Sequence, residues 1–175
     1  MGKFEDFPLL ALRGRVLFPD TTVNFDVGRP ISISAVKSSA EYESRLFVCA
    51  QKQSDKEDIT DEDVYTAGTV VKIRQITRLP GSTVRLTVEG LFRAQARQVR
   101  KENGTYIATV EEIVPVRGDK SLEEAYFRTS KEILKDITST DSRLSKDALS
   151  ALDRCSDPDV FVNLAAHYLQ IKTEQ

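Results

Sequence analysis

Few residues in this chain are suited to acid–base or nucleophilic catalysis. His167 is the single histidine, and it lies within the apolar run at residues 164–169. A Ser-His-Asp triad would have to use that imidazole as its base. In such a run, a packed or half-exposed helix residue is more common than a catalytic base. We therefore expect no catalytic residue and no enzyme activity from this chain by itself, although composition leaves a Ser-Lys dyad open.

Nucleotide and metal chemistry also lack their usual sequence signals. A phosphate-binding loop ends in Gly-Lys-Ser/Thr, and the one Gly-Lys pair, Gly2-Lys3, has no such context. One histidine and two distant cysteines, Cys49 and Cys155, cannot supply four zinc ligands without carboxylates. We expect no cofactor and no metal in this chain, and Cys49 to be a buried free thiol.

An acidic segment at residues 54–63 invites a comparison with calcium-binding loops. It holds six acidic residues but no glycine, and their spacing does not match an EF-hand loop. A solvated loop is the favoured interpretation.

A group of arginines in the following segment could instead form a face that binds RNA. Single-strand platforms combine such charge with exposed aromatic rings, and only Phe92 and Tyr106 lie nearby in the sequence. We therefore favour solvated strand faces, expect no nucleic-acid partner, and keep RNA binding as an alternative. The arginines are Arg74, Arg78, Arg85, Arg93, Arg97 and Arg100.

Composition limits the class of protein further. The chain has 175 residues, 40% of them hydrophobic, and 25 basic against 27 acidic residues give a net charge of −2. This balance gives no general attraction to nucleic acid or to an anionic membrane. No stretch approaches the roughly 20 apolar residues of a membrane span, and the first residues lack the apolar core of a signal peptide. We expect a cytoplasmic protein without a membrane partner.

Most of the chain up to residue 114 has strand patterns. Residues 7–12 and 15–18 are short apolar runs, and residues 83–89 alternate between apolar and polar side chains with a period of two. Pro80-Gly81 joins that alternating run to the Val- and Ile-rich run before it, and a type II turn is expected there.

A second hairpin is predicted directly after the first. Asn103-Gly104 separates residues 92–99 from residues 106–114, and this dipeptide is the strongest short hairpin signal. Two linked hairpins indicate an antiparallel sheet or a small barrel.

Helices are predicted at one place inside the β region and after it. Residues 31–44 have roughly helical apolar spacing, and Ser121 with Glu124 forms the pattern of a capping box. The residues of this second helix that share one apolar face are Leu122, Tyr126, Ile133 and Ile137.

Two further helices complete a C-terminal bundle. One is predicted near residues 146–154, and another starts at Asp157-Pro158, with Asp as the cap and Pro at the first helical position. The chain is therefore expected to be α+β, with a β-rich part at residues 1–117 and an α-helical part at residues 118–175.

Six segments in register resemble the amino-terminal domain of the Lon family of ATP-dependent proteases. The resemblance covers nearly the whole chain, with departures at Asp20, where the family often has Gly, and in the loop at residues 79–82. The segments are residues 7–13 with 16–19 (FPLLALR, VLFP), 27–32 (VGRPIS), 46–52 (LFVCAQK), 63–70 (DVYTAGTV), 83–94 (TVRLTVEGLFRA) and 164–172 (LAAHYLQIK).

The resemblance implies a PUA-like β pseudo-barrel with one helix, followed by a small α-helical bundle. It implies a non-catalytic domain that recognises unfolded, damaged or tagged protein substrates and helps to assemble a hexamer with other Lon subunits. ATP, Mg and a Ser-Lys protease site would belong to other domains of the full-length enzyme. A stand-alone Lon-domain protein that acts as an adaptor or ligand-binding module is the alternative.

Substrate capture requires apolar groups on loops that a rigid barrel holds in place. Two loops offer them, one running from Phe18-Pro19 to Val23 and one at the hairpin tip, Leu79-Pro80. These five residues are the candidate substrate-binding residues. The competing interpretation is that Phe18 and Leu79 only plug the ends of the barrel.

Overall fold

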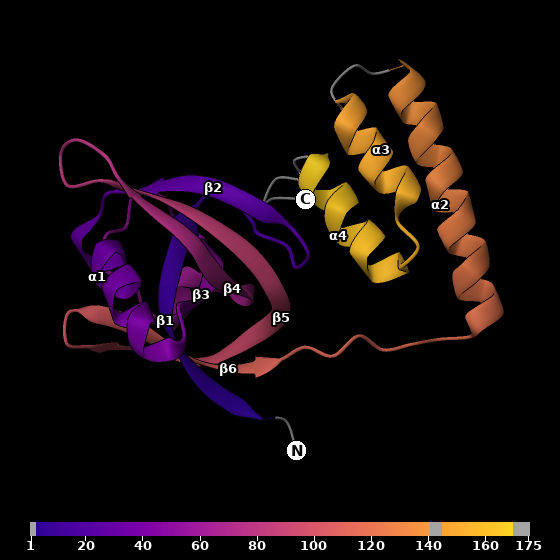
Figure 1. Ribbon diagram of the computed structural model, residues 1–175. Helices are drawn as coiled ribbons and strands as arrows, with labels where there is room; N and C mark the ends of the chain where they lie inside the picture. The colour runs from indigo at the N-terminus through magenta and orange to yellow at the C-terminus, as the bar shows by residue number, and fades with distance from the viewer. Residues whose placement is uncertain (1–2, 141–144, 170–175) are drawn as a thin grey trace. The chain divides into compact units, whose positions relative to one another are not determined.

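A computed structural model describes residues 3–140 and 145–169 of the chain (Figure 1). The described residues form two compact units, which divide between Ile113 and Val114. Residues 113–119 contain neither helix nor strand, and the boundary expected at residues 117 and 118 lies within this segment.

The first unit is a six-stranded sheet with one helix. Its strands are β1 (Phe4–Arg13), β2 (Thr22–Val27), β3 (Arg45–Gln51), β4 (Val64–Arg78), β5 (Val84–Glu102) and β6 (Thr105–Glu112). Their order is β2-β5-β4-β3-β1-β6, and a further pairing of β5 with β6 closes the sheet on itself. All pairs are antiparallel except β1 with β3. The predicted α+β class is confirmed.

Strand β5 is shared by both predicted hairpins. It bends around the sheet, pairing with β2 near its start and with β6 near its end (Figure 1). At its first turn Gly81 has a φ of 76°, and at its second turn Asn103 and Gly104 have φ values of 48° and 76°. The Asn-Gly prediction is confirmed, because a type I′ turn needs positive φ at both residues.

The apolar core of this unit lies on both faces of the sheet. Along β3, Phe47 and Cys49 belong to one buried cluster, while Leu46 and Val48 belong to another. A strand covered on both faces is apolar throughout, which explains the unbroken run at residues 46–50. Cys49 is a free, buried thiol as predicted, and burial raises its pKa to about 12.

Helix α1 (Pro30–Ser38) covers the second of these clusters through Ala35 and Val36. A 3₁₀ turn over Ser39–Tyr42 continues it, so the predicted helix at residues 31–44 is found in two parts. The turn ends at Glu43, where the backbone enters the left-handed region with a φ of 55°.

One sequence prediction in the first unit needs correction, and one strand was missed. Residues 15–18 form a loop and not a strand, because the Leu17 carbonyl accepts a hydrogen bond from the buried hydroxyl of Thr69 instead of a strand partner. Strand β2 was not predicted, although Val23, Phe25 and Val27 alternate there with polar residues.

The second unit contains α2 (Lys120–Thr140), α3 (Lys146–Arg154) and α4 (Pro158–Tyr168). Its core joins the three helices through Leu134, Leu152 and Phe161, and the Phe127 ring meets the Phe161 ring edge-on at 5.3 Å between centroids. No described helix is long and apolar enough to cross a membrane.

The helix starts are partly as predicted. Asp157 caps α4 by accepting hydrogen bonds from the backbone N–H groups of Asp159 and Val160, as expected. The predicted capping box at Ser121 is wrong: α2 begins at Lys120, and the Asp119 carboxylate accepts from the Leu122 N–H at 2.9 Å.

The predicted apolar face of α2 is exposed, whereas Phe127 and Leu134 face the other helices. That exposed face consists of Leu122, Tyr126, Ile133 and Ile137.

Candidate functional site

The loop that carries Phe18 and Pro19 is held firmly against β5. Gly90 of β5 donates to the Thr21 carbonyl at 2.9 Å and accepts from the Asp20 N–H at 3.0 Å. A side chain at Gly90 would overlap the Phe18 carbonyl oxygen and come within 2.9 Å of the Pro19 Cα atom. Pro19 is therefore buried in this contact, while Phe18 stays half-buried.

The second candidate loop is the tip of the β4–β5 hairpin. Leu79 is half-buried and Pro80 exposed, and the Leu79 N–H donates to the Thr83 carbonyl at 2.9 Å. Neither Leu79 nor Phe18 belongs to the two core clusters of the barrel, whereas Val23 packs against the second cluster.

The structure does not bring the two candidate loops together. The β2–β5 ladder runs from the pair Thr22 and Glu89, next to the first loop, to the pair Val27 and Val84, next to the hairpin tip. Five steps of about 3.4 Å separate these pairs by roughly 17 Å. Strand β2 thus lies between the two groups of apolar side chains.

One edge of β2 has no strand partner among the described residues. β2 ends the strand order and pairs with β5 alone. In an antiparallel pair, every second residue directs its N–H and C=O away from the partner strand. Within the described chain, residues 22–27 make no backbone hydrogen bond outside the β5 ladder.

A pocket of about 640 Å³ opens beside this edge. Its walls are the end of β1 at residues 10–13, the β2 edge at residues 24–27, and the start of α1. β1 pairs with β6 only through residues 4–8, so its last residues have β3 on one side and the pocket on the other.

Arginines dominate the charge of this pocket. Its charged lining residues are Arg13, Arg15, Asp26, Arg29 and Arg85. Asp26 accepts two hydrogen bonds from Arg85, at 2.7 and 2.9 Å, and this contact lowers the pKa of Asp26 and raises that of Arg85. Apart from this pair, the charged lining residues are Arg13, Arg15 and Arg29, and the lining contains no further acidic side chain.

The Arg29 side chain links strands β1 and β3 by hydrogen bonds. Its guanidinium donates to the Ala11 carbonyl of β1 and, at 3.2 Å, to the Gln51 side chain of β3. Burial lowers the pKa of Arg29, and the like charge of Arg13 lowers it further, although Glu57 and Tyr106 act in the opposite direction. Arg13 and Arg29 thus place two positive charges along this wall of the pocket.

The hairpin arginines considered for RNA binding are mostly occupied by carboxylates. Arg74 pairs with Glu89, Arg97 with Glu111, and Arg100 with Asp6 and Glu102. These pairs, which join different strands except for Arg100 with Glu102, neutralise much of the arginine charge and leave little of it free for phosphates.

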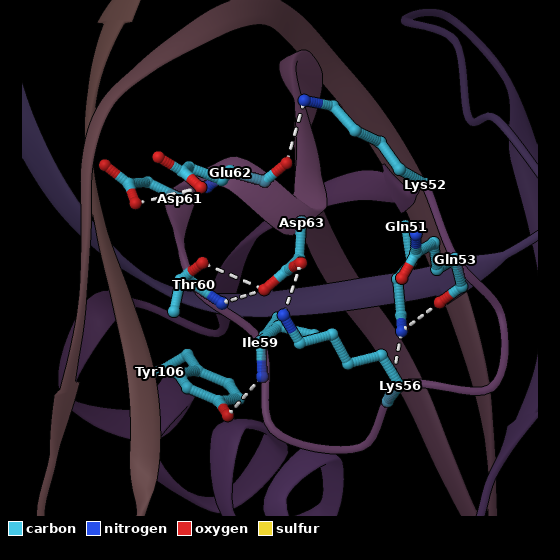
Figure 2. Close-up of polar contacts among 10 residues, drawn as sticks. All are labelled: Gln51, Lys52, Gln53, Lys56, Ile59, Thr60, Asp61, Glu62, Asp63 and Tyr106. Atoms are coloured by element: carbon cyan, nitrogen blue, oxygen red, sulfur yellow. Dashed lines mark hydrogen bonds and ion pairs between the residues drawn. The ribbon is translucent and has the colours of Figure 1, made fainter.

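The acidic segment is a loop that ends in a 3₁₀ turn at Asp61–Asp63, and it has its own internal hydrogen bonds (Figure 2). The Asp63 carboxylate accepts from the Thr60 N–H at 2.8 Å and from Lys56 Nζ at 2.7 Å. Lys56, followed by the backbone and side chain of Thr60, lowers the pKa of Asp63 to about 2. The hydroxyl of Tyr106 accepts from the Ile59 N–H at 2.8 Å and ties the loop to β6.

Among the described residues, no group of three or more His, Cys, Asp or Glu side chains is placed to hold a metal ion. His167 is half-buried in α4, with its ring 5.2 Å from that of Tyr168. Sequence reasoning missed the β2 edge and its arginines. The alternation Thr-Val-Asn-Phe-Asp-Val at residues 22–27 could have revealed the strand, but not its missing partner.

Comparison with known proteins places this arrangement in a family context. A family model described as the ATP-dependent protease La (LON) substrate-binding domain matches residues 6–175. The Lon protease of Clostridioides difficile (strain 630) is 33% identical over 98% of this chain and 22% of that protein. The Lon protease of Lawsonia intracellularis (strain PHE/MN1-00) is 34% identical over 98% and 21%, respectively. The chain thus spans about 22% of the length of these curated relatives.

Solved structures share the fold at lower sequence identity. The N-terminal domain of Mycobacterium avium complex Lon protease matches with a TM-score of 0.69 and 17% identity, over 93% of this chain and 82% of that chain. A Lon N-terminal domain protein from Xanthomonas campestris matches with a TM-score of 0.53 and 19% identity, over 93% and 98%.

Proposed function

This chain belongs to the family of Lon (ATP-dependent protease La) substrate-binding domains, and on that premise we propose that it captures unfolded or damaged polypeptides for a Lon protease. The observation that carries the proposal is the presence of half-buried or exposed apolar side chains at both ends of the free β2 edge. Phe18 and Val23 lie at one end, and Leu79 and Pro80 lie at the other.

Membership of this family also separates substrate binding, assigned to this chain, from catalysis, assigned to other domains. A substrate-binding domain of a Lon protease is a non-catalytic part of that enzyme. ATP hydrolysis, with its Mg, and Ser-Lys proteolysis would be carried out by other parts of a full-length protein, since this chain has no phosphate-binding loop. The same proposal includes a second role for this chain, which is to help assemble Lon subunits with one another.

Unfolded substrates expose apolar side chains that the native protein buries, and this difference is what the two loops would detect. Pro19 is buried against Gly90, so a charge there would disturb the fold. Val23 and Pro80 are the better positions for a test.

The test is a titration of the chain with a reduced, alkylated and hence permanently unfolded protein, beside its native disulfide-bonded form. We expect the unfolded form alone to bind. Val23→Glu and Pro80→Glu should weaken binding about three- to tenfold, which corresponds to loss of roughly 1 kcal/mol of apolar contact.

Val116→Glu is the matched control, because Val116 is 98% exposed and lies outside both loops. Because Val23 packs partly on the core, the similarly sized Val23→Thr provides a second variant, and thermal melting verifies that each variant folds. Equal binding of unfolded protein by the folded variants and the control would remove these residues from the site. Absence of binding by the unaltered chain would reject the proposed function.

A further inference from the structure

The pocket beside β2 is bordered by backbone edges. A strand that presents one face to a pocket lines it with every second residue, because successive side chains point to opposite sides. Here four consecutive residues of β1, 10–13, and four of β2, 24–27, line the same opening. The opening therefore lies between two strands of the closed sheet that do not pair with each other.

The dimensions of this opening suit a single extended segment. The four lining residues of β2 extend over about 13 Å, the length of a four-residue strand. Unpaired N–H and C=O groups along a strand edge are a template for another strand. The cavity volume, about 640 Å³, is within the range of ligand pockets, roughly 300–1,000 Å³.

The charge of the opening selects the kind of segment. Arg13 and Arg15 are exposed, and within the described part of the chain neither has a carboxylate at ion-pair distance. Arg29 adds a third positive charge behind them, while Asp26 is already bound by Arg85. An anionic group placed here would relieve the repulsion between like charges.

We propose that this opening is a strand-addition site, in which an extended polypeptide segment pairs with the free edge of β2 and places an acidic side chain against Arg13 and Arg15. The inference rests on the proposed function, because unfolded substrates would supply the segment. Backbone pairing gives affinity without regard to sequence, and the arginines add a preference for segments with an acidic side chain. The apolar loops at both ends of β2 would contact the flanking residues of the same segment.

Three short fluorescent peptides test this proposal. The first alternates threonine and valine around a central glutamate, the second has lysine in place of the glutamate, and the third is the first with every backbone amide N-methylated. We expect the glutamate peptide to bind about fivefold more tightly than the lysine peptide, in line with exposed charge pairs. N-methylation should abolish binding, because it removes the backbone donors.

Variants of the protein test whether Arg13 and Arg15 cause the preference for the glutamate peptide. Arg13→Glu combined with Arg15→Glu should lose or reverse the preference for the glutamate peptide. The control combines Arg128→Glu with Arg154→Glu, two exposed arginines of the helical unit, and changes the net charge by the same amount. The control should keep the preference of the unaltered chain.

Several outcomes would overturn the inference. Equal binding of the N-methylated peptide would exclude strand pairing, and an unchanged preference in the Arg13/Arg15 variant would exclude the arginine pocket. A chain that dimerises through this edge and excludes peptide, measured by sedimentation, would assign the edge to a second copy. If the unfolded protein of the preceding test still binds in these cases, the proposed function stands while the strand-addition site fails.

Discussion

At the scale of single residues, close contacts hold the site in place. Gly90 lets the Phe18–Pro19 backbone lie directly on β5. The hydroxyls of Thr21, in the loop, and Thr69, in β4, donate to the Phe18 and Leu17 carbonyls at 2.6 and 2.7 Å and hold the loop in place. The loop therefore presents Phe18 from a fixed backbone, and little ordering entropy is lost when a ligand binds.

Asp63 provides a residue-scale prediction. Its folded pKa of about 2 is below the 3.8 of an unperturbed aspartate, so the folded state is stabilised when the carboxyl group is ionised. That contribution is present above pH about 4 and is lost as the pH falls towards about 2. We expect Asp63→Asn to melt at a lower temperature than the unaltered chain at pH 7. The difference between the two melting temperatures should become smaller as the pH falls.

The control for Asp63 is Asp55→Asn, an exposed aspartate of the same loop. Its melting curve should follow that of the unaltered chain from pH 7 to pH 2. A gap between Asp63→Asn and the unaltered chain that is constant with pH would contradict the role of the carboxylate charge.

At the scale of elements, local signals predict well where a single chemical preference decides the structure. Asn103-Gly104 and Asp157-Pro158 determine a turn and a helix start by backbone geometry and capping, and both are found. Where two neighbouring residues can serve the same purpose, the sequence is ambiguous. Asp119 and Ser121 are both good caps, and the structure uses Asp119.

The start of α2 yields the element-scale prediction. Asp119→Ala should destabilise the helical unit by about 1 kcal/mol, the usual cost of removing an N-cap side chain. Ser121→Ala should be neutral or slightly stabilising, because alanine is the better helix former inside the first turn. Chemical denaturation followed by circular dichroism measures both variants. If Ser121→Ala lost more stability than Asp119→Ala, Ser121 and not Asp119 would be the helix cap, and this prediction would be wrong.

At the scale of the whole molecule, the candidate site depends on contacts between distant parts of the sequence. The pocket exists because β5 leaves β2 to pair with β6, while β1 pairs with β3 and leaves the β2 edge open. No local pattern encodes which edge stays unpaired. The sequence therefore predicted apolar loops at Phe18 and Leu79, but it could not predict the strand edge and the arginines between them.

The central claim is that unfolded polypeptide binds along the β2 edge, and hydrogen exchange of the chain with and without a permanently unfolded protein tests it most directly. We expect slowed amide exchange in residues 22–27 of β2 on binding, since alternate amides there would acquire a backbone partner. Binding accompanied by protection only in the helical unit, residues 114–169, with no change in β2, would contradict the claim.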